Sequence, residues 1–206
     1  MTAYPELPDG AFAKADPSSD LAFYAQPRLV HHIDDPAVAA VTALYRERLP
    51  PGGTVLDLMS SWVSHLPGDV LYGEVIGQGM NAAELAANPQ LDRWFVQNLN
   101  ANSVLPLADG SVDAVCQCAG VQYLQRPDLV YADLHRVMRS GAPILVTFSN
   151  RCFPTKAVAI WQALPPQEQQ RLVGLYLTRA GFASVEAQTL RTGRGSDPLW
   201  AVCGRR

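Results

Sequence analysis

The sequence lacks the features that mark secreted, metal-binding, membrane and nucleic-acid-binding proteins. It has four cysteines, none spaced as Cys-x-x-Cys, so we expect reduced thiols, a cytoplasmic protein and no metal site. No apolar run reaches about 18 residues and no signal peptide is present, which predicts a soluble chain without a membrane partner. The 16 Lys and Arg residues form no cluster and the net charge is -3, which argues against a nucleic-acid partner.

What is present is the composition of one globular domain with an extra arm. Hydrophobic residues make up 48% of the chain and charged residues 17%, enough apolar material for a substantial core. The first 20 residues are rich in Pro, Asp, Ser and Gly and predict a loose arm. Asp35-Pro36 is a helix start, with Asp at the N-cap. We therefore divide the chain into an N-terminal arm over 1–35 and an α/β domain over 36–206.

The second half of the arm is aromatic and basic and admits two interpretations. It is either a strap that packs Phe23 and Tyr24 on the domain, or an active-site lid. As a lid it would supply Tyr24, Arg28, His31 or His32 to a substrate. The adjacent histidines do not predict a metal site, because neighbouring residues rarely aim at one ion without further ligands.

Residues 54–58 are the centre of the predicted domain. This short apolar run follows a Pro-Pro-Gly-Gly turn and reads as a buried strand, with Asp57 at its carboxyl end. Ligands of open α/β sheets bind beyond the carboxyl ends of the strands. The chain then turns through Met59, Ser60 and Ser61, and either serine could cap a short helix whose N–H groups face an anion.

A second strand is expected within 69–79, ending at Gly79. Met80 and Asn81 follow it. Asn81 and Glu84 have the spacing of a capping box, in which the Asn side chain caps the helix and the Glu side chain returns to the Asn backbone. This pattern predicts a helix that ends near residue 88.

Three more strands can be placed by their ends. The third, over 94–99, ends in Asn98-Leu99, and an Asp109-Gly110 turn leads into a fourth that ends near Ala119. After a further helix, a fifth strand over 143–149 leads into a polar loop. Helices over 155–163 and 167–179 and a final hairpin of strands over 183–190 and 199–204 complete the chain.

Two passages resemble a known superfamily. Val55-Leu56-Asp57-Leu58 resembles the first motif of class I S-adenosylmethionine-dependent methyltransferases, and 104–115 closely resembles a passage of their type 11 members. The resemblance covers about residues 36–204. It implies a Rossmann-like, doubly wound sheet of seven mostly parallel strands with a C-terminal antiparallel strand. It also implies S-adenosyl-L-methionine as cofactor and methyl transfer to a small-molecule substrate; it assigns no oligomeric state.

The resemblance also implies residue roles. Residues at the strand ends are expected to bind the cofactor: Asp57, Met59, Ser60, Ser61, Gly79, Met80, Asn81, Asn98, Leu99 and Ala119. Polar residues of the arm and of the later loops are expected to bind substrate: Tyr24, Arg28, Gln122, Asn150, Arg151 and Lys156. The candidate catalytic bases are Tyr123, His31 and His32.

The sequence departs from the superfamily pattern in two places. Met59, Ser60 and Ser61 replace the glycines of the first turn, and Gly79 stands where an acid normally binds the cofactor ribose. These departures support an alternative, a non-catalytic ligand-binding or regulatory protein that retains the fold. A nicotinamide-dependent oxidoreductase is less favoured, because the first turn lacks Gly-x-Gly-x-x-Gly and the chain ends in a hairpin.

Overall fold

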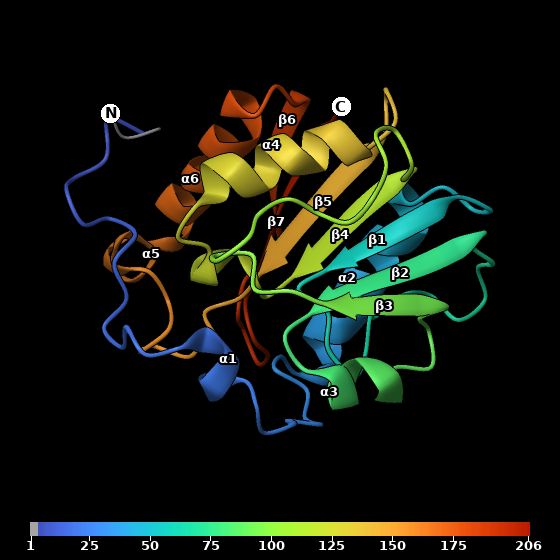
Figure 1. The fold of residues 1–206 in the computed structure, drawn as a ribbon, viewed down its shortest axis with the longest axis horizontal. Helices are drawn as coiled ribbons and strands as arrows, with labels where there is room; N and C mark the ends of the chain where they lie inside the picture. The colour runs from blue at the N-terminus through green and yellow to red at the C-terminus, as the bar shows by residue number, and fades with distance from the viewer. Residues whose placement is uncertain (1–3) are drawn as a thin grey trace.

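The sheet has seven strands in the order β3-β2-β1-β4-β5-β7-β6 in a computed structural model that describes residues 4–206 (Figure 1). Its strands are β1 Thr54–Leu58, β2 Glu74–Gly79, β3 Arg93–Val96, β4 Ala114–Cys118, β5 Pro143–Phe148, β6 Ala183–Arg191 and β7 Leu199–Arg205. Neighbouring strands are parallel except at β7, which is antiparallel to both β5 and β6. The expected fold is therefore confirmed.

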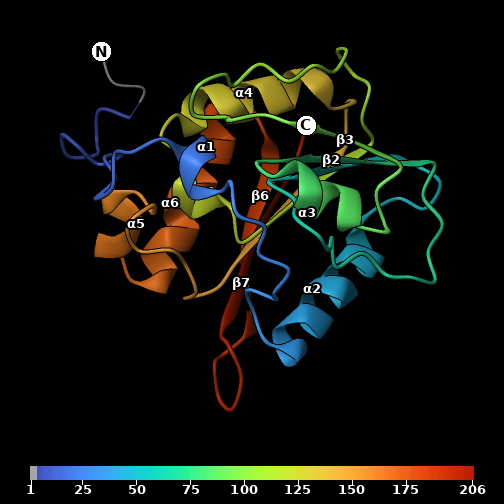
Figure 2. The same cartoon turned by 60° about the horizontal axis from the view of Figure 1, so that its bottom comes forward.

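Helices cover both faces of this sheet. They are α1 Asp20–Phe23, α2 Asp35–Arg48, α3 Ala82–Ala87, α4 Pro127–Val137, α5 Ala159–Ala163 and α6 Pro166–Arg179. Figure 2 shows α4 and α6 on one side of the sheet and α2 and α3 on the other. No helix within residues 4–206 is long and apolar enough to cross a membrane.

The central strands form because their side chains are buried on both faces. In β1, Val55 belongs to the core under α2, whereas Leu56 and Leu58 belong to the core under α4 and α6, as the two-residue period of a strand requires. Asp34 caps α2 by accepting a hydrogen bond from the Ala37 amide at 3.0 Å, so the helix cap lies one residue before the expected Asp35.

The helix expected after β1 is absent, which corrects the sequence interpretation. Residues 59–73 are irregular. Two neighbours bind their backbone: the Thr42 hydroxyl on α2 donates to the His65 carbonyl at 2.9 Å, and the Asn88 amide donates to the Ser61 carbonyl at 3.0 Å. These side chains satisfy backbone groups that a helix would otherwise pair internally.

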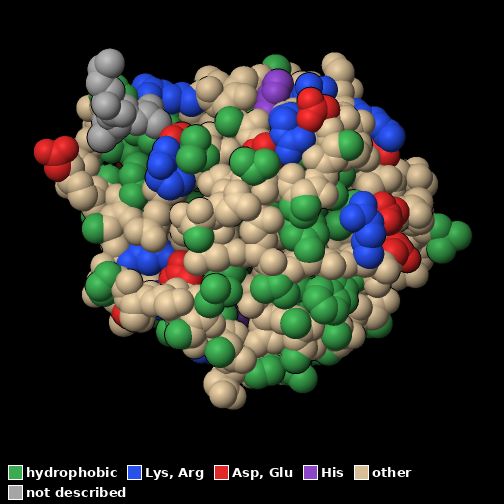
Figure 3. Space-filling model, in the orientation of Figure 1, with side chains coloured by type: hydrophobic (Ala, Val, Ile, Leu, Met, Phe, Trp, Pro, Cys, Tyr) green, Lys and Arg blue, Asp and Glu red, His purple; other side chains and the backbone are tan. Residues whose placement is uncertain are grey.

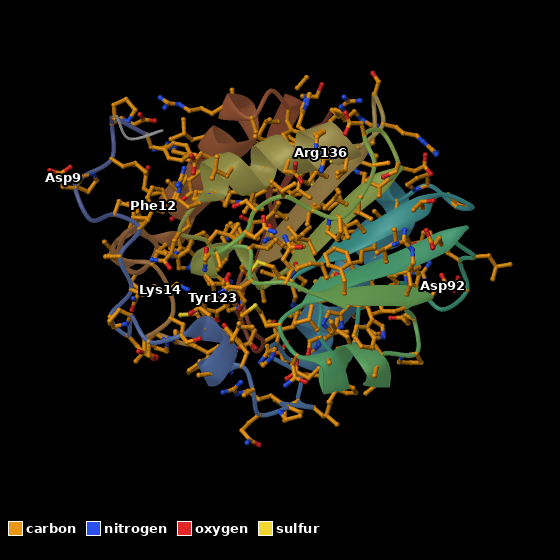
Figure 4. The ribbon with its side chains drawn as sticks, in the orientation of Figure 1. Asp9, Phe12, Lys14, Asp92, Tyr123 and Arg136 are labelled. Atoms are coloured by element: carbon orange, nitrogen blue, oxygen red, sulfur yellow. The ribbon has the colours of Figure 1, made fainter. Side chains whose placement is uncertain are left out.

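The N-terminal arm is packed rather than loose, so that expectation is wrong for the described residues; residues 1–3 lie outside them. The Tyr4 ring lies 5.2 Å from the ring of Tyr176 on α6 and is 3% exposed. Phe12 lies 6.2 Å from the same Tyr176 ring, and Lys14 pairs with Val158 in an isolated β-bridge. Figure 4 labels Phe12 and Lys14 on this arm.

Lys156 anchors the next part of the arm. Its side chain is completely buried, and its ammonium lies 3.0 Å from the Asp16 carboxylate and 3.5 Å from the Asp20 carboxylate. It also donates to the Ser18 carbonyl at 2.7 Å. Lys14 donates to Asp20 at 2.7 Å. Two buried lysines thus hold the arm against the end of the sheet.

Candidate functional site

A cavity of about 220 Å³ lies where the carboxyl ends of β1, β2 and β4 meet the arm. It is lined by residues from the turn after β1, the exits of β2, β3, β4 and β5, and the arm. Figure 1 shows the arm and α1 on the side toward which the parallel strands point, and Figure 4 labels Tyr123 at the same end. The fold therefore places a cavity at the site expected for a ligand of an open α/β sheet.

Asp57, at the end of β1, is the buried acid of this cavity. It is 3% exposed, and its carboxylate accepts a hydrogen bond from the Ser60 hydroxyl at 2.5 Å. The Cys116 thiol approaches its other oxygen at 3.7 Å. Burial raises the pKa of Asp57 to about 6, against the lowering effect of these hydrogen bonds. A cation in the cavity would favour the ionised carboxylate.

Met59 takes the place of a glycine in the turn after β1. Its φ is 57°, in the left-handed region where glycine is the default residue. Its amide donates to the Gln78 side chain at 3.0 Å, and its sulfur lies 3.1 Å from the Gln117 amide nitrogen. Its side chain also lies against Gly120, where a Cβ would collide with it. Met59 therefore fills space between the ends of β1 and β4.

Gly79, at the end of β2, has no room for a side chain. It does not have a positive φ. However, a Cβ at this position would collide with the carbonyl oxygen of Ser60, whose amide donates to the Gln78 carbonyl at 2.6 Å. The close approach of the first turn to β2 thus excludes an acid at residue 79.

Asn81 caps α3 as expected and also binds the arm. Its side-chain oxygen accepts from the amides of Ala83 and Glu84 at 2.9 and 3.1 Å. Its side-chain nitrogen donates to the carbonyls of Tyr24 and Ala25 at 2.8 and 3.1 Å. The helix cap is therefore also an attachment point of the arm.

The other half of the predicted capping box is wrong. The Glu84 carboxylate does not return to Asn81 but accepts from the Arg28 amide and from the Ser61 hydroxyl, both at 2.7 Å. These two longer-range partners, one on the arm and one in the first turn, draw the carboxylate toward the cavity, which it lines. Sequence spacing alone could not reveal this alternative.

Three residues after β3 form one wall of the cavity. Asn98 accepts from the Asn100 amide at 3.0 Å, and Leu99 is buried. The Asn100 side chain, which the sequence interpretation did not include, donates to the Asp20 carboxylate and to the Tyr123 carbonyl, both at 3.0 Å. Opposite them, Ala119 at the end of β4 has a φ of 52° and also lines the cavity.

An aromatic cluster forms the arm side of the cavity. The Tyr24 and Tyr123 rings lie 6.2 and 6.1 Å from the Phe153 ring. The Arg28 guanidinium lies 5.3 Å from the same ring and forms no ion pair with a carboxylate in the described part of the chain. The Tyr123 hydroxyl accepts from the Phe153 amide at 2.9 Å, and burial raises the Tyr123 pKa to about 12. Tyr123 is thus poorly suited to act as a base.

The two expected histidine bases differ in position. His32 lines the cavity with its ring 5.6 Å from Phe153, and burial lowers its pKa, which favours the neutral imidazole. His31 does not line the cavity, because its ring stacks on Trp62 at 5.0 Å. His65 was missed. It lines the cavity, its buried Nδ1 has no hydrogen-bond partner, and burial lowers its pKa to about 4.

Three of the expected substrate residues lie outside the cavity. Gln122 is buried and donates to the Ala119 carbonyl at 2.9 Å, Asn150 is exposed, and Lys156 holds the arm. Arg151 does line the cavity, but its guanidinium donates to Asp197 at 2.9 Å. No group of three or more His, Cys, Asp and Glu side chains within residues 4–206 could hold a metal ion.

Residues 59–146 match the family model described as a methyltransferase domain. An S-adenosylmethionine-dependent methyltransferase from Mesorhizobium loti is similar in structure (TM-score 0.57, 16% identity, 82% of this chain and 98% of that one). The [4+2]-cyclase SpnF is also similar in structure (TM-score 0.61, 15% identity, 81% of this chain and 80% of that one). A third similar structure is phosphoethanolamine N-methyltransferase 2 from Haemonchus contortus in complex with S-adenosyl-L-methionine. Its TM-score is 0.59 and its identity 11%, over 82% of this chain and 52% of that one. No curated protein matches the sequence.

The cavity suits the cofactor that this fold implies. S-adenosylmethionine carries a positive sulfonium, and the carboxylates of Asp57 and Glu84 line the cavity without an ion-pair partner among residues 4–206. Asn98 and Leu99 offer an amide and an apolar surface on the β3 side. The strand order and the antiparallel β7 give this chain the fold of class I S-adenosylmethionine-dependent methyltransferases, and residues 59–146 are similar to a methyltransferase domain.

Proposed function

We propose that this protein transfers the methyl group of S-adenosylmethionine to a small-molecule acceptor. The observation that carries the proposal is the cavity itself, which is lined by the buried Asp57 and by residues of the arm. The bound cofactor would supply the electrophilic methyl group. The protein would contribute position and exclusion of water, which such a transfer needs more than covalent help.

The residues that line the cavity divide between the two ligands in this proposal. We assign the first turn and the exits of β2, β3 and β4 to the cofactor, through the lining residues Asp57, 59–61, 79–81, 98–99 and Ala119. His32, whose neutral imidazole is favoured by burial, is the candidate base for an acceptor that must lose a proton. His31, Gln122, Asn150 and Lys156 have no role in ligand contact, because they lie outside the cavity.

The arm side of the cavity favours an acceptor with a flat apolar part and a negative group. Tyr24, Tyr123 and Phe153 provide aromatic surface. The Arg28 guanidinium donates to the Phe23 carbonyl at 2.9 Å but has no carboxylate partner among residues 4–206, so its remaining N–H groups could bind a carboxylate or phosphate. Arg151 is less available, since Asp197 already accepts from it.

Calorimetric titration with S-adenosylhomocysteine, S-adenosylmethionine and NAD tests the cofactor half of the proposal. We expect both adenosylated ligands to bind. At 100 times its dissociation constant, S-adenosylhomocysteine should add about 2.7 kcal/mol to the free energy of unfolding by mass action and so raise the melting temperature. NAD is expected to give no heat. Flat titrations with all three would contradict the proposal.

A non-catalytic binding or regulatory protein is the second candidate, and Met59 favours it. Its side chain occupies space between β1 and β4, and the helix expected after the first turn is absent. An assay of turnover distinguishes the two candidate functions. Given S-adenosylmethionine and a panel of aromatic acids, a methyltransferase releases S-adenosylhomocysteine. Binding of the cofactor without release for any member of the panel favours the second candidate.

A further inference from the structure

We propose that Glu84, on the first turn of α3, replaces the acid missing from the end of β2 and accepts hydrogen bonds from the cofactor ribose. The inference rests on the proposed function, since it assumes that S-adenosylmethionine occupies the cavity. It assigns to Glu84 a ligand-binding role that its sequence spacing, typical of a helix cap, conceals.

The end of β2 cannot hold a ribose acid in this fold. The first turn passes so close to β2 that the Ser60 carbonyl occupies the place of a side chain at Gly79. The hydrogen bond from the Ser60 amide to the Gln78 carbonyl, 2.6 Å, fixes this approach. An acid for the ribose must therefore come from a neighbouring position that projects into the same space.

Glu84 is the acid of β2 and α3 that lines the cavity. One carboxylate oxygen accepts from the Ser61 hydroxyl at 2.7 Å, which places it beside the first turn. The other accepts from the Arg28 amide at 2.7 Å, which places it beneath the arm. The carboxylate therefore lies between the first turn and the exit of β2, in the region that the missing acid would serve.

The carboxylate has capacity for a ligand. A carboxylate has about four acceptor sites, and the side chain uses two of them within the protein. It has no Lys or Arg ion-pair partner among residues 4–206. Two acceptor sites remain for two adjacent hydroxyls, the chemistry that a ribose presents.

The same geometry couples the ribose to the arm. Glu84 holds the Arg28 amide, and its neighbour Asn81 holds the Tyr24 carbonyl. Arg28 and Tyr24 both line the arm side of the cavity. A ligand that fixes the Glu84 carboxylate thus also fixes the segment of the arm that covers the acceptor, and cofactor binding is expected to slow proteolysis of residues 20–34.

The test compares two ligands on two proteins. S-adenosylhomocysteine and its 2′-deoxy analogue are titrated calorimetrically into the wild type and into Glu84→Gln. The wild type should prefer the complete ribose by about tenfold, as expected for a hydrogen bond to a charged acceptor. In Glu84→Gln the affinity for S-adenosylhomocysteine should fall by about tenfold, and the two ligands should bind within about twofold of each other.

Asp16→Asn is the control for effects of the arm. Asp16 binds Lys156 and lies outside the cavity, so this substitution loosens the arm without touching the ribose site. It should weaken both ligands equally, if at all, and retain the ribose preference. Melting temperatures of both variants within a few degrees of the wild type establish that the fold is intact.

The outcomes separate this inference from the proposed function. A ribose preference that survives in Glu84→Gln overturns the role of Glu84 and leaves the cofactor assignment intact. Absence of any S-adenosylhomocysteine binding to the wild type overturns both. Loss of preference in Glu84→Gln together with its retention in Asp16→Asn supports the proposal.

Discussion

Asp57 shows how a single residue couples the fold to the ligand. Its side chain is buried at the carboxyl end of β1, and this burial raises its pKa from the ordinary 3.8 to about 6. An ionised Asp57 is therefore unfavourable for the folded protein alone. A positively charged ligand in the cavity would offset this unfavourable term, because an opposite charge favours the ionised form.

Asp57→Asn should remove a pH-dependent loss of stability. The native pKa exceeds the unfolded one, so the stabilising contribution of Asp57 is fully present below about pH 4 and is lost as the pH rises through about 6. The asparagine does not ionise. Relative to the wild type, the variant's free energy of unfolding should therefore increase by about 2 to 3 kcal/mol between pH 4 and pH 7. Urea unfolding of both proteins at pH 4 and pH 7 measures these free energies. The same difference between variant and wild type at the two pH values would contradict the prediction.

Gly79→Asp should destabilise the protein rather than restore a ribose acid. The new Cβ collides with the Ser60 carbonyl, and overpacking of this kind costs about 1–3 kcal/mol. Gly68→Asp is the matched control, because Gly68 is exposed and has open space at its Cβ position. Melting temperatures should fall for the first variant and not for the second. Tighter S-adenosylhomocysteine binding by Gly79→Asp at unchanged stability would show that the first turn moves aside.

At the scale of elements, the arm and the first turn form one unit with the sheet. Thr42 of α2 and Asn88, directly after α3, bind the backbone of the irregular turn after β1, and the arm is fixed by Asn81, Glu84 and Lys156. Residues of the arm line the cavity, and the arm is packed on α6 through Tyr4, as a strap would be. The packing agrees with the strap interpretation for the first part of the arm, and a lid over residues 20–34 stays a prediction.

Lys156→Met should release the arm. The substitution leaves the Asp16 carboxylate without its buried cation and leaves Asp20 paired with Lys14 alone, so the arm loses its main attachment at residues 16–20. We expect tryptic cleavage after Lys14 or Arg28 to accelerate by about tenfold or more, measured by mass spectrometry. Arg171→Met, which removes an exposed ion pair, should leave the rate unchanged. Equal rates in wild type and Lys156→Met would show that other contacts hold the arm.

At the scale of the molecule, stability should be graded across the sheet. Every residue of β5 is buried, and all of β7 except its last, whereas three of the four residues of β3 are exposed. Figure 3 shows apolar side chains gathered over β3 and α3, and Trp94 and Val96 of β3 are 41% and 43% exposed. None of the residues of β6, the strand at the other edge, is buried either, so both edges of the sheet are less protected than its centre.

Native-state hydrogen exchange should follow this gradient. Amides of β4 and β5 are expected to exchange only through global unfolding, while those of β3 exchange through local opening with a smaller free energy. Exchange measured against low concentrations of urea distinguishes the two classes by their denaturant dependence. Equal protection in β3 and β5 would indicate that the edge is covered in solution.

The sequence by itself determined the fold of this protein. Strands such as β1 and β5 are continuous apolar runs between turn residues, and α4 and α6 begin at prolines and repeat apolar residues at helical spacing. These signals are local, so the order of elements and the antiparallel final strand could be predicted. The strand ends were placed for the same reason, and all ten of the expected cofactor residues line the cavity.

Only the tertiary structure decided what those residues can do. The Glu84 carboxylate does not cap its own helix, because it accepts hydrogen bonds from Arg28 and Ser61, which are distant in sequence. Lys156 was expected to bind substrate. Instead it anchors the arm, because its ammonium pairs with Asp16 and Asp20 from the other end of the chain. Gly79 is a glycine because another segment passes against it. Each depends on contacts between separate segments, and no local pattern of residues encodes such contacts.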